Sequence, residues 1–236
     1  MERTEPRPAR VRPGEGRRLG VLLKRERQLW ADGLEHVAGV DEVGVGPLAG
    51  PVVAAAVVFP RGAGVRGVDD SKRLTPARRA ELAETIRATC TVWSVACVTV
   101  DEIDRINIYR ASLEAMRQAV RGLTTPPQHV LVDARTIPGV DVPQEAIIKG
   151  DARCHAIAAA SILAKTARDL MMTQLETRFP GYGFADHKGY ATREHRDAIR
   201  RLGPCEIHRR SFMLYGQSEL WVWAPDALTT EDEPPC

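Results

Sequence analysis

Residues 36–59 read HVAGVDEVGVGPLAGPVVAAAVVF, two apolar runs separated by a glycine-rich segment. The runs at 36–43 and 51–59 are rich in valine and predict β-strands. Because the glycines between them, at 44–50, favour a turn, we expect the two strands to form a hairpin. A further apolar run at 92–100 predicts a third strand, so the fold begins with a β-rich stretch.

Helices are expected on both sides of this third strand. Thr75 as N-cap and Pro76 at the first helical position predict a helix that continues to about residue 88. Later, apolar side chains recur at spacings of three and four, which indicates an amphipathic helix packed on a sheet. These side chains are Ile106, Tyr109, Leu113, Met116, Val120 and Leu123.

The second half of the chain continues the alternation of strands and helices. Short runs at 129–133 and 146–149 predict two more strands. An alanine-rich helix is expected from about Asp151 toward Arg178, followed by a helical C-terminal region. Strands that alternate with helices after an initial hairpin predict an α/β fold with a mixed sheet.

The two ends of the chain differ in charge from the middle. Residues 1–33 hold nine Lys and Arg against five Asp and Glu, and their prolines and glycines predict a flexible basic arm, with a short helix considered at 22–30. The folded domain is expected at 34–223 and an acidic flexible tail at 224–236. A second basic tract, 187–210, suits phosphate backbones, although a solvated helix face explains either tract taken alone.

The composition excludes several classes of protein. The 236 residues are 44% hydrophobic and 27% charged, which is typical of a globular protein with one core. No apolar run reaches the roughly 18 residues that a membrane helix needs, and no secretory signal is evident, so a cytoplasmic protein is expected. The five cysteines are scattered and form no C-x-x-C pair, which argues against a disulfide framework or a zinc site.

Four acidic residues stand next to apolar or alanine-rich stretches, where a charged side chain is unusual in a water-soluble protein. Asp41 and Glu42 end the first strand, Asp133 ends the run 130–132, and Asp151 opens the alanine-rich helix. Alone, Asp151 is typical of an N-cap and Asp133 of a turn. As a set, they could meet at one edge of a sheet, where their mutual repulsion would call for a cation.

All-carboxylate ligation suits Mg²⁺ or Mn²⁺, and pairs of such ions serve phosphodiester hydrolysis, so a nuclease is indicated. One geometric difficulty arises, because consecutive strand residues such as Asp41 and Glu42 point to opposite faces. We expect Gly44 and Gly46 to make the strand irregular enough to relieve it. The glycine-rich segment is not a Walker A sequence; it is either a bulged turn or a place where main-chain N–H groups approach a nucleic-acid backbone.

Seven motifs occur together in one order. They are Val40-Asp41-Glu42-Val43-Gly44, Gly46-Pro47-Leu48-Ala49-Gly50-Pro51, Asp70-Ser71-Lys72-Arg73-Leu74, Gly150-Asp151, Ala158-Ala159-Ala160-Ser161-Ile162-Leu163-Ala164-Lys165, His187-Lys188-Gly189-Tyr190 and His208-Arg209-Arg210-Ser211-Phe212. This series resembles the ribonuclease HII family over residues 36 to 214.

The resemblance implies a ribonuclease H-like catalytic domain, with a five-stranded mixed sheet flanked by helices and a helical C-terminal region. It implies cleavage of the RNA strand of an RNA–DNA hybrid, or 5′ of a single ribonucleotide in duplex DNA, leaving 3′-hydroxyl and 5′-phosphate ends. A monomer is the default expectation.

The resemblance also implies the roles of individual residues. The catalytic and metal-binding carboxylates would be Asp41, Glu42, Asp133 and Asp151, with Mg²⁺ or Mn²⁺ as cofactor. The substrate would be bound by Gly44, Val45, Gly46, Ser71, Lys72 and Tyr190. The glycine-rich turn would contact the 2′-hydroxyl and Tyr190 the sugar on its DNA side, while Ser71 and Lys72 would bind a phosphate of the DNA strand.

Val45 departs from the family pattern, which has arginine or lysine between the two glycines. The backbone donors remain, but one phosphate-facing charge is lost, so reduced affinity or weaker junction preference is expected rather than inactivity. The departure prompts an alternative, a catalytically weak or silent hybrid-binding module. Two further alternatives rank lower: the sister type ribonuclease HIII, and a small-molecule phosphate enzyme. None of the histidines is assigned to catalysis.

Overall fold

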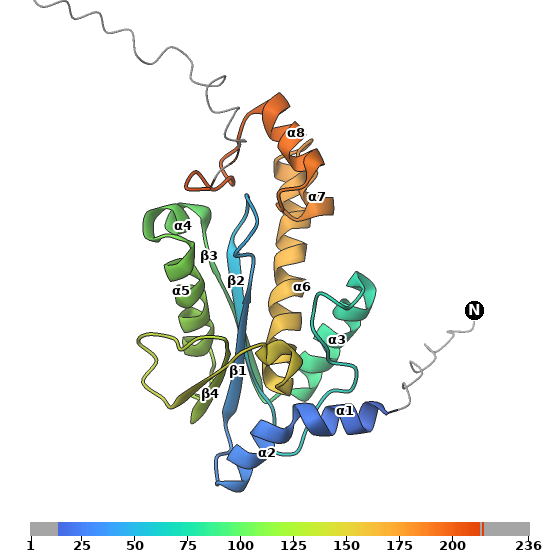
Figure 1. Cartoon of the computed structure of the whole chain (residues 1–236), viewed down its shortest axis with the longest axis vertical. Helices are drawn as coiled ribbons and strands as arrows, with labels where there is room; N and C mark the ends of the chain where they lie inside the picture. The colour runs from blue at the N-terminus through green and yellow to red at the C-terminus, as the bar shows by residue number, and fades with distance from the viewer. Residues whose placement is uncertain (1–13, 213, 215–236) are drawn as a thin grey trace, which may run out of the picture.

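The computed structural model describes residues 14–212 and 214, which form a five-stranded mixed sheet flanked by helices (Figure 1). The strands are β1 (Val37–Val43), β2 (Val52–Val58), β3 (Val92–Val98), β4 (His129–Asp133) and β5 (Gln144–Ile147). Their order is β3-β2-β1-β4-β5, antiparallel from β3 to β1 and parallel from β1 to β5. The predicted hairpin and the predicted fold class are confirmed.

Helices α5 (Ile108–Arg121) and α6 (His155–Arg178) cover the two faces of the sheet, and α3 (Pro76–Thr89) packs beside α6 (Figure 1). The short helix α4 (Val100–Ile106) precedes α5, while α7 (Phe184–His187) and α8 (Arg193–Leu202) pack at the C-terminal end of α6. Strand β2 is buried along its whole length because alternate side chains enter two separate cores. Ala55 packs in the core beneath α6, and Ala54 packs in the core beneath α5.

Helix α6 lies directly on β1, and a glycine makes this approach possible. A Cβ atom added to Gly39 would lie 2.1 Å from the carbonyl carbon of Ala156 in α6, so no larger residue fits. The close approach matters for the site, since it brings the middle of α6 next to the end of β1. Among the described residues, no helix has the length and apolar character needed to cross a membrane.

The amphipathic helix predicted from the stripe Ile106 to Leu123 is confirmed as α5, but the first and last residues of the stripe lie outside it. Ile106 closes α4, and the chain bends at Asn107, whose φ of +71° is outside the helical region. The side chain of Asn107 then caps α5 by accepting a hydrogen bond from the Arg110 amide at 3.0 Å. Tyr109 therefore sits in the first turn of α5 and is 56% exposed, although the periodicity placed it on the buried stripe.

The predicted flexible arm also needs correction, because its second half is folded. Residues 14–33 contain α1 (Glu15–Leu22) and α2 (Lys24–Ala31), whose Leu29 and Trp30 pack into the core beneath α6. Cys154, the N-cap of α6, makes no side-chain capping bond, and the buried carboxylate of Glu26 accepts from the Ala156 amide at 2.8 Å instead. Residues 1–13 and the predicted tail at 224–236 lie outside the described part of the chain.

Candidate active site

Three of the four predicted carboxylates gather at one end of the sheet. Asp41 and Asp133 stand at the carboxyl ends of the parallel neighbours β1 and β4, one residue past the paired Val40 and Val132. Asp151 lies in a 3₁₀ turn, Gly150–Ala152, just after β5. Asp151 is therefore not the N-cap of the alanine-rich helix, which begins at His155.

Glu42 lies on the opposite face of β1 from Asp41. The ladder with β2 stays regular through Val43, pairing Asp41 with Ala55 and Glu42 with Ala54, which belong to the α6 and α5 cores respectively. The expected strand irregularity at these residues is absent, since the chain turns only at Gly44, where φ is +89°. Asp41 and Glu42 therefore point to opposite faces of β1, as expected for consecutive residues of a regular strand.

The carboxylates repel one another strongly enough to change their titration. Burial, followed by the negative charges of Glu42 and Asp133, raises the pKa of Asp41 well above its usual range. Burial and the charge of Asp133 also raise the pKa of Asp151. For Glu42, burial raises the pKa, while the cationic Arg135 opposes the rise. Asp133 thus interacts with all three other carboxylates.

Hydrogen bonds fix two of these groups from behind. Asp133 Oδ1 accepts from the Gly150 amide at 2.7 Å, and a Cβ at Gly150 would lie only 2.6 Å from Ile157 Cδ1. Ser161, on α6, donates to Asp41 and contacts Ser71 Oγ at 3.0 Å. These contacts hold the end of β4 against the 3₁₀ turn at Gly150 and the end of β1 against α6.

Ser71 is placed differently from what the sequence led us to expect. Its side chain is only 1% exposed and faces Ser161 behind Asp41, so in this conformation its hydroxyl does not face a nucleic-acid strand. Lys72, the next residue, is exposed, and its charge opposes the rise that burial causes in the pKa of Glu42 and of Asp151. Of this pair, only Lys72 is open to a phosphate.

The donor set fits a hard divalent cation. Carboxylate oxygens are the ligands that Mg²⁺ and Mn²⁺ prefer, and a cation would relieve the repulsion that raises the pKa of Asp41. Within residues 14–212 and 214, no three His, Cys, Asp or Glu side chains are already arranged as a metal site. Asp41, Asp133 and Asp151 could hold an ion from one face, and Glu42 could join them around the end of β1.

Two buried arginines hold the glycine-rich turn in place. Arg209 donates to the carbonyl oxygens of Gly44 at 2.5 Å, Val45 at 3.0 Å and Gly50 at 2.8 Å. Arg168 of α6 donates to the carbonyl oxygens of Pro51 at 2.9 Å, Ala49 at 3.1 Å and Lys188 at 3.0 Å. Both side chains are 0% exposed.

These bonds point the turn's carbonyl oxygens toward the protein interior. Burial and the nearby Arg168 lower the pKa of Arg209 to about 9, so it remains charged at neutral pH. The amides of Val45 and Gly46 donate to no other residue in the described part of the chain and are free for a ligand. Sequence reasoning missed this role, because Arg168 falls on an apolar helix and Arg209 in a basic tract.

Two histidines of the basic tract, His195 and His208, are buried, and the third, His187, is half-buried. His195 Nε2 and His208 Nε2 are 3.1 Å apart, and the rings of His187 and His195 stack with centroids 4.3 Å apart. Burial lowers the pKa of both His195 and His208 to about 4, so they are neutral at pH 7. Because His208 pairs with Ala49, the cluster supports the glycine-rich turn from beneath.

Tyr190 lies beside the turn and is 42% exposed. Lys165 Nζ and Arg168 Cζ lie 5.7 and 6.0 Å from its ring centroid, on cation–π contacts that orient the ring. An exposed aromatic ring fixed in this way is suited to packing against a sugar or base.

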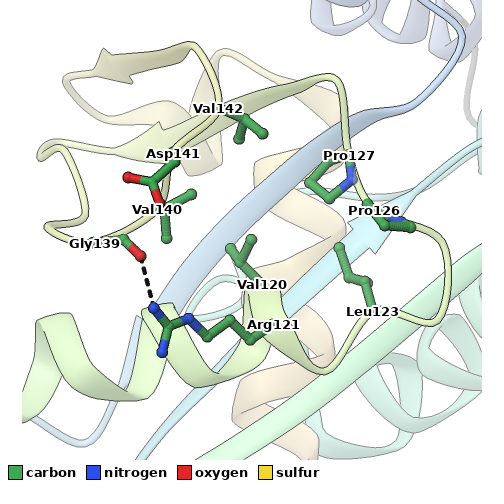
Figure 2. A pocket seen from close by; sticks show the side chains of 9 residues that line it. All are labelled: Val120, Arg121, Leu123, Pro126, Pro127, Gly139, Val140, Asp141 and Val142. Atoms are coloured by element: carbon green, nitrogen blue, oxygen red, sulfur yellow. Dashed lines mark hydrogen bonds between the residues drawn. The ribbon is translucent and has the colours of Figure 1, made fainter.

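A pocket of about 240 Å³ lies at the other end of the sheet (Figure 2). It is lined by Val120, Arg121, Leu123, Pro126, Pro127, Gly139, Val140, Asp141 and Val142. These residues surround the starts of β4 and β5, while the predicted carboxylates stand at the ends of the strands. The pocket therefore takes no part in the candidate site and gives no support to a small-molecule phosphate enzyme.

Comparisons with known proteins agree on one family. A family model described as Ribonuclease HII matches residues 38–215, which include all four carboxylates. A ribonuclease HII of Myxococcus xanthus is 56% identical over 199 residues, 84% of this chain and 68% of the relative. A ribonuclease HII of Moorella thermoacetica is 52% identical over 203 residues, 86% of this chain and 98% of the relative.

The fold has a matching solved structure. The crystal structure of ribonuclease H2 from Pyrococcus horikoshii OT3 superposes with a TM-score of 0.65 at 27% identity, covering 76% of this chain and 94% of that chain.

Proposed function

This chain belongs to the ribonuclease HII family, and so to the ribonuclease H class of endoribonucleases; we propose that it cuts 5′ of a single ribonucleotide in duplex DNA, and within the RNA strand of RNA–DNA hybrids. The observation that carries this proposal is the gathering of Asp41, Asp133 and Asp151 at one end of the sheet, with Glu42 beside them. Glu42, Asp133 and Asp151 are half-buried at the edge of the molecule, where a duplex can approach them, whereas an enclosed cavity could not admit a duplex.

In this proposal Asp41, Glu42, Asp133 and Asp151 hold Mg²⁺ or Mn²⁺. When bound, such ions lower the pKa of a water molecule and offset the charge that develops on the phosphate, so that cleavage leaves 3′-hydroxyl and 5′-phosphate ends. The protein contributes the positions of the donors. Gly150 anchors Asp133, and Ser161 anchors Asp41.

Recognition of the ribonucleotide falls to the glycine-rich turn. The free amides of Val45 and Gly46, together with Gly44, can donate to the 2′-hydroxyl, which is the group that separates RNA from DNA. Tyr190 packs against the neighbouring sugar on the DNA side, and Lys72 binds a phosphate of the DNA strand. Ser71 would reach the same phosphate only by turning away from Ser161.

The proposal also covers the cellular process, the location and the oligomeric state of the protein. The substrate, duplex DNA with an embedded ribonucleotide or an RNA–DNA hybrid, implies a role in ribonucleotide excision during DNA repair. We place the protein in the cytoplasm, acting as a monomer.

A second candidate, the weak or silent hybrid-binding module, is favoured by Val45 alone. The repulsion among Asp41, Glu42 and Asp133 argues against it, because a pure binding module for a polyanion gains nothing from buried negative charge.

One experiment separates the two candidates. The purified chain is incubated with a DNA duplex carrying one ribonucleotide, with Mg²⁺, with Mn²⁺ and with chelator, beside an all-DNA duplex and an Asp133→Asn variant. A metal-dependent nick 5′ of the ribonucleotide, absent from the chelator, all-DNA and variant arms, supports the nuclease. Binding without any nick would favour the silent module.

A further inference from the structure

Arg135 stands at the candidate site, but none of the roles assigned above includes it. It follows the carboxylate Asp133 by two residues, through Ala134, whose φ is +59°. The Arg135 amide donates to the Asp133 carbonyl at 2.7 Å, closing a three-residue turn. A positive φ is uncommon for a residue other than glycine, and here it directs the chain back toward α5 immediately after β4 ends.

The guanidinium of Arg135 rests on an exposed aromatic ring. Its Cζ atom lies 5.1 Å from the ring centroid of Tyr109, in the first turn of α5. Within residues 14–212 and 214, its side chain makes one hydrogen bond, a long one from Nη1 to Ser112 Oγ at 3.5 Å. A ring that covers one face of a guanidinium leaves the N–H groups at its edge free to donate.

Arg135 has no acidic partner, in contrast to two arginines of the nearby helices α4 and α5. Arg105 and Arg117 both pair with glutamates on their own helices. Arg135 has no carboxylate at ion-pair distance among residues 14–212 and 214. Because Arg135 follows Asp133 by two residues and its side chain packs on Tyr109 and Ser112 of α5, its charge lies on the α5 side of the carboxylate end of the sheet.

We propose that Arg135 binds a backbone phosphate of the nucleic-acid substrate on the α5 side of the carboxylates, with Tyr109 holding the guanidinium in place. The planar fork of N–H groups fits two phosphate oxygens at once. A polyanion that approaches four carboxylates needs nearby cations, and Val45 supplies none at the glycine-rich turn. Lys72 supplies one such charge, and Arg135 supplies a second. This inference rests on the proposed function.

The test is the salt dependence of cleavage. The Michaelis constant and kcat for the duplex with one ribonucleotide are measured over a series of salt concentrations, for the full chain and for Arg135→Ala, Arg135→Lys and Tyr109→Leu. For Arg135→Ala we expect a five- to twenty-fold higher KM at low salt, and a slope of log KM against log salt that is shallower by about one phosphate contact. We expect kcat at saturating substrate to stay within about three-fold, as for a group that binds without entering the reaction.

Two variants separate charge from shape. Arg135→Lys should keep the slope of the full chain while raising KM about two- to five-fold, because lysine keeps the charge and loses the fork. Tyr109→Leu should raise KM in the same range as Arg135→Lys without changing the slope. Arg87→Ala is the matched control, since Arg87 also lies over an exposed ring, Trp93, at 5.2 Å, but beside the edge strand β3. It should match the full chain.

Three outcomes overturn the inference. One is an unchanged salt slope in Arg135→Ala, and another is a fall in kcat with KM unchanged, which would make Arg135 a counter-ion of Glu42. The third is an equal effect of Arg87→Ala. If the unmodified chain does not cut the duplex at all, the proposed function fails first, and that result is read from the unmodified chain alone.

Discussion

The carboxylate end of the sheet and the glycine-rich turn lie side by side and are stabilised in opposite ways. At the carboxylate end, burial and then the like charges of Glu42 and Asp133 raise the pKa of Asp41, and no cation within residues 14–212 and 214 forms an ion pair with it. At the turn, Arg168 and Arg209 are buried among carbonyl oxygens that satisfy most of their N–H groups. The turn is held by hydrogen bonds within the protein, whereas the carboxylates would be completed by the metal ion that the proposed function requires.

The largest effect should come from removing one negative charge at the carboxylate end. Asp133→Asn keeps an oxygen that can accept from Gly150 but loses the charge that acts on the other three carboxylates. We expect cleavage to fall at least about a thousandfold, roughly 4 kcal/mol in the activation free energy. The free energy of unfolding, measured by urea denaturation, should not fall.

Asp141→Asn serves as the control for that variant. Asp141 lines the pocket at the starts of β4 and β5, so its loss should leave the cleavage rate unchanged. If both variants cut equally well, the carboxylate end is not the active site.

The next largest effect should come from breaking the turn's support. Arg209→Met has similar volume but leaves the buried carbonyl oxygens of Gly44, Val45 and Gly50 without a donor. Each unsatisfied group costs roughly 1–3 kcal/mol, so we expect the free energy of unfolding to fall by about 3 kcal/mol or more. Urea denaturation followed by circular dichroism measures it.

Arg210→Met is the matched control for this second prediction. Arg210 is exposed, so the same substitution one residue later should change the free energy of unfolding by less than about 0.5 kcal/mol. A similar loss in both variants would show that the turn does not depend on Arg209.

Low pH should also destabilise the protein, because His195 and His208 beneath the glycine-rich turn become protonated. The folded-state pKa of His195 and His208 is about 4, below the usual value of 6.5, so the folded protein favours their neutral forms. Their contribution to stability is fully present above pH 6.5 and is lost as the pH falls toward 4. At about 1.4 kcal/mol per pKa unit, each histidine contributes up to about 3 kcal/mol.

A double variant isolates this contribution. In His195→Gln/His208→Gln, the decline in unfolding free energy between pH 7 and pH 4 should be smaller than in the unmodified chain. Carboxylates also titrate in this range, so the difference between the two curves is the quantity to compare. Identical curves would show that His195 and His208 do not contribute to the pH dependence of stability.

The sequence predicted the carboxylate end far better than the turn. Strand ends, unlike buried cation contacts, can be found from local patterns: Asp133 follows three apolar residues, and the hairpin follows from valines and glycines. Arg209 donates to residues about 160 positions earlier, a contact that no local pattern records. The same holds for Glu26, whose capping of α6 turned a predicted arm into part of the fold.

Ser71 and Tyr109 are two residues whose side-chain direction the sequence patterns did not predict. A motif placed Ser71 on the substrate, but packing against Ser161 turned its hydroxyl inward. Periodicity placed Tyr109 in the core, but the break at Asn107 shifted the start of α5 and left its ring exposed beneath Arg135. Motif and period identify the element, while the side chain's direction depends on neighbours that are distant in the sequence.

The smallest effect should come from adding to the turn the charge that this chain lacks. The carbonyl oxygen of Val45 is held inward by Arg209, so its side chain can be replaced without disturbing the bonds that shape the turn. Val45→Arg should tighten binding of the duplex three- to tenfold at low salt and steepen the salt dependence by about one phosphate contact, as measured by fluorescence anisotropy with an uncut all-DNA duplex. Val45→Met, which is long but uncharged, should do neither. If Val45→Arg leaves affinity at low salt unchanged, the turn relies on its amides alone, and position 45 contributes no charge to binding.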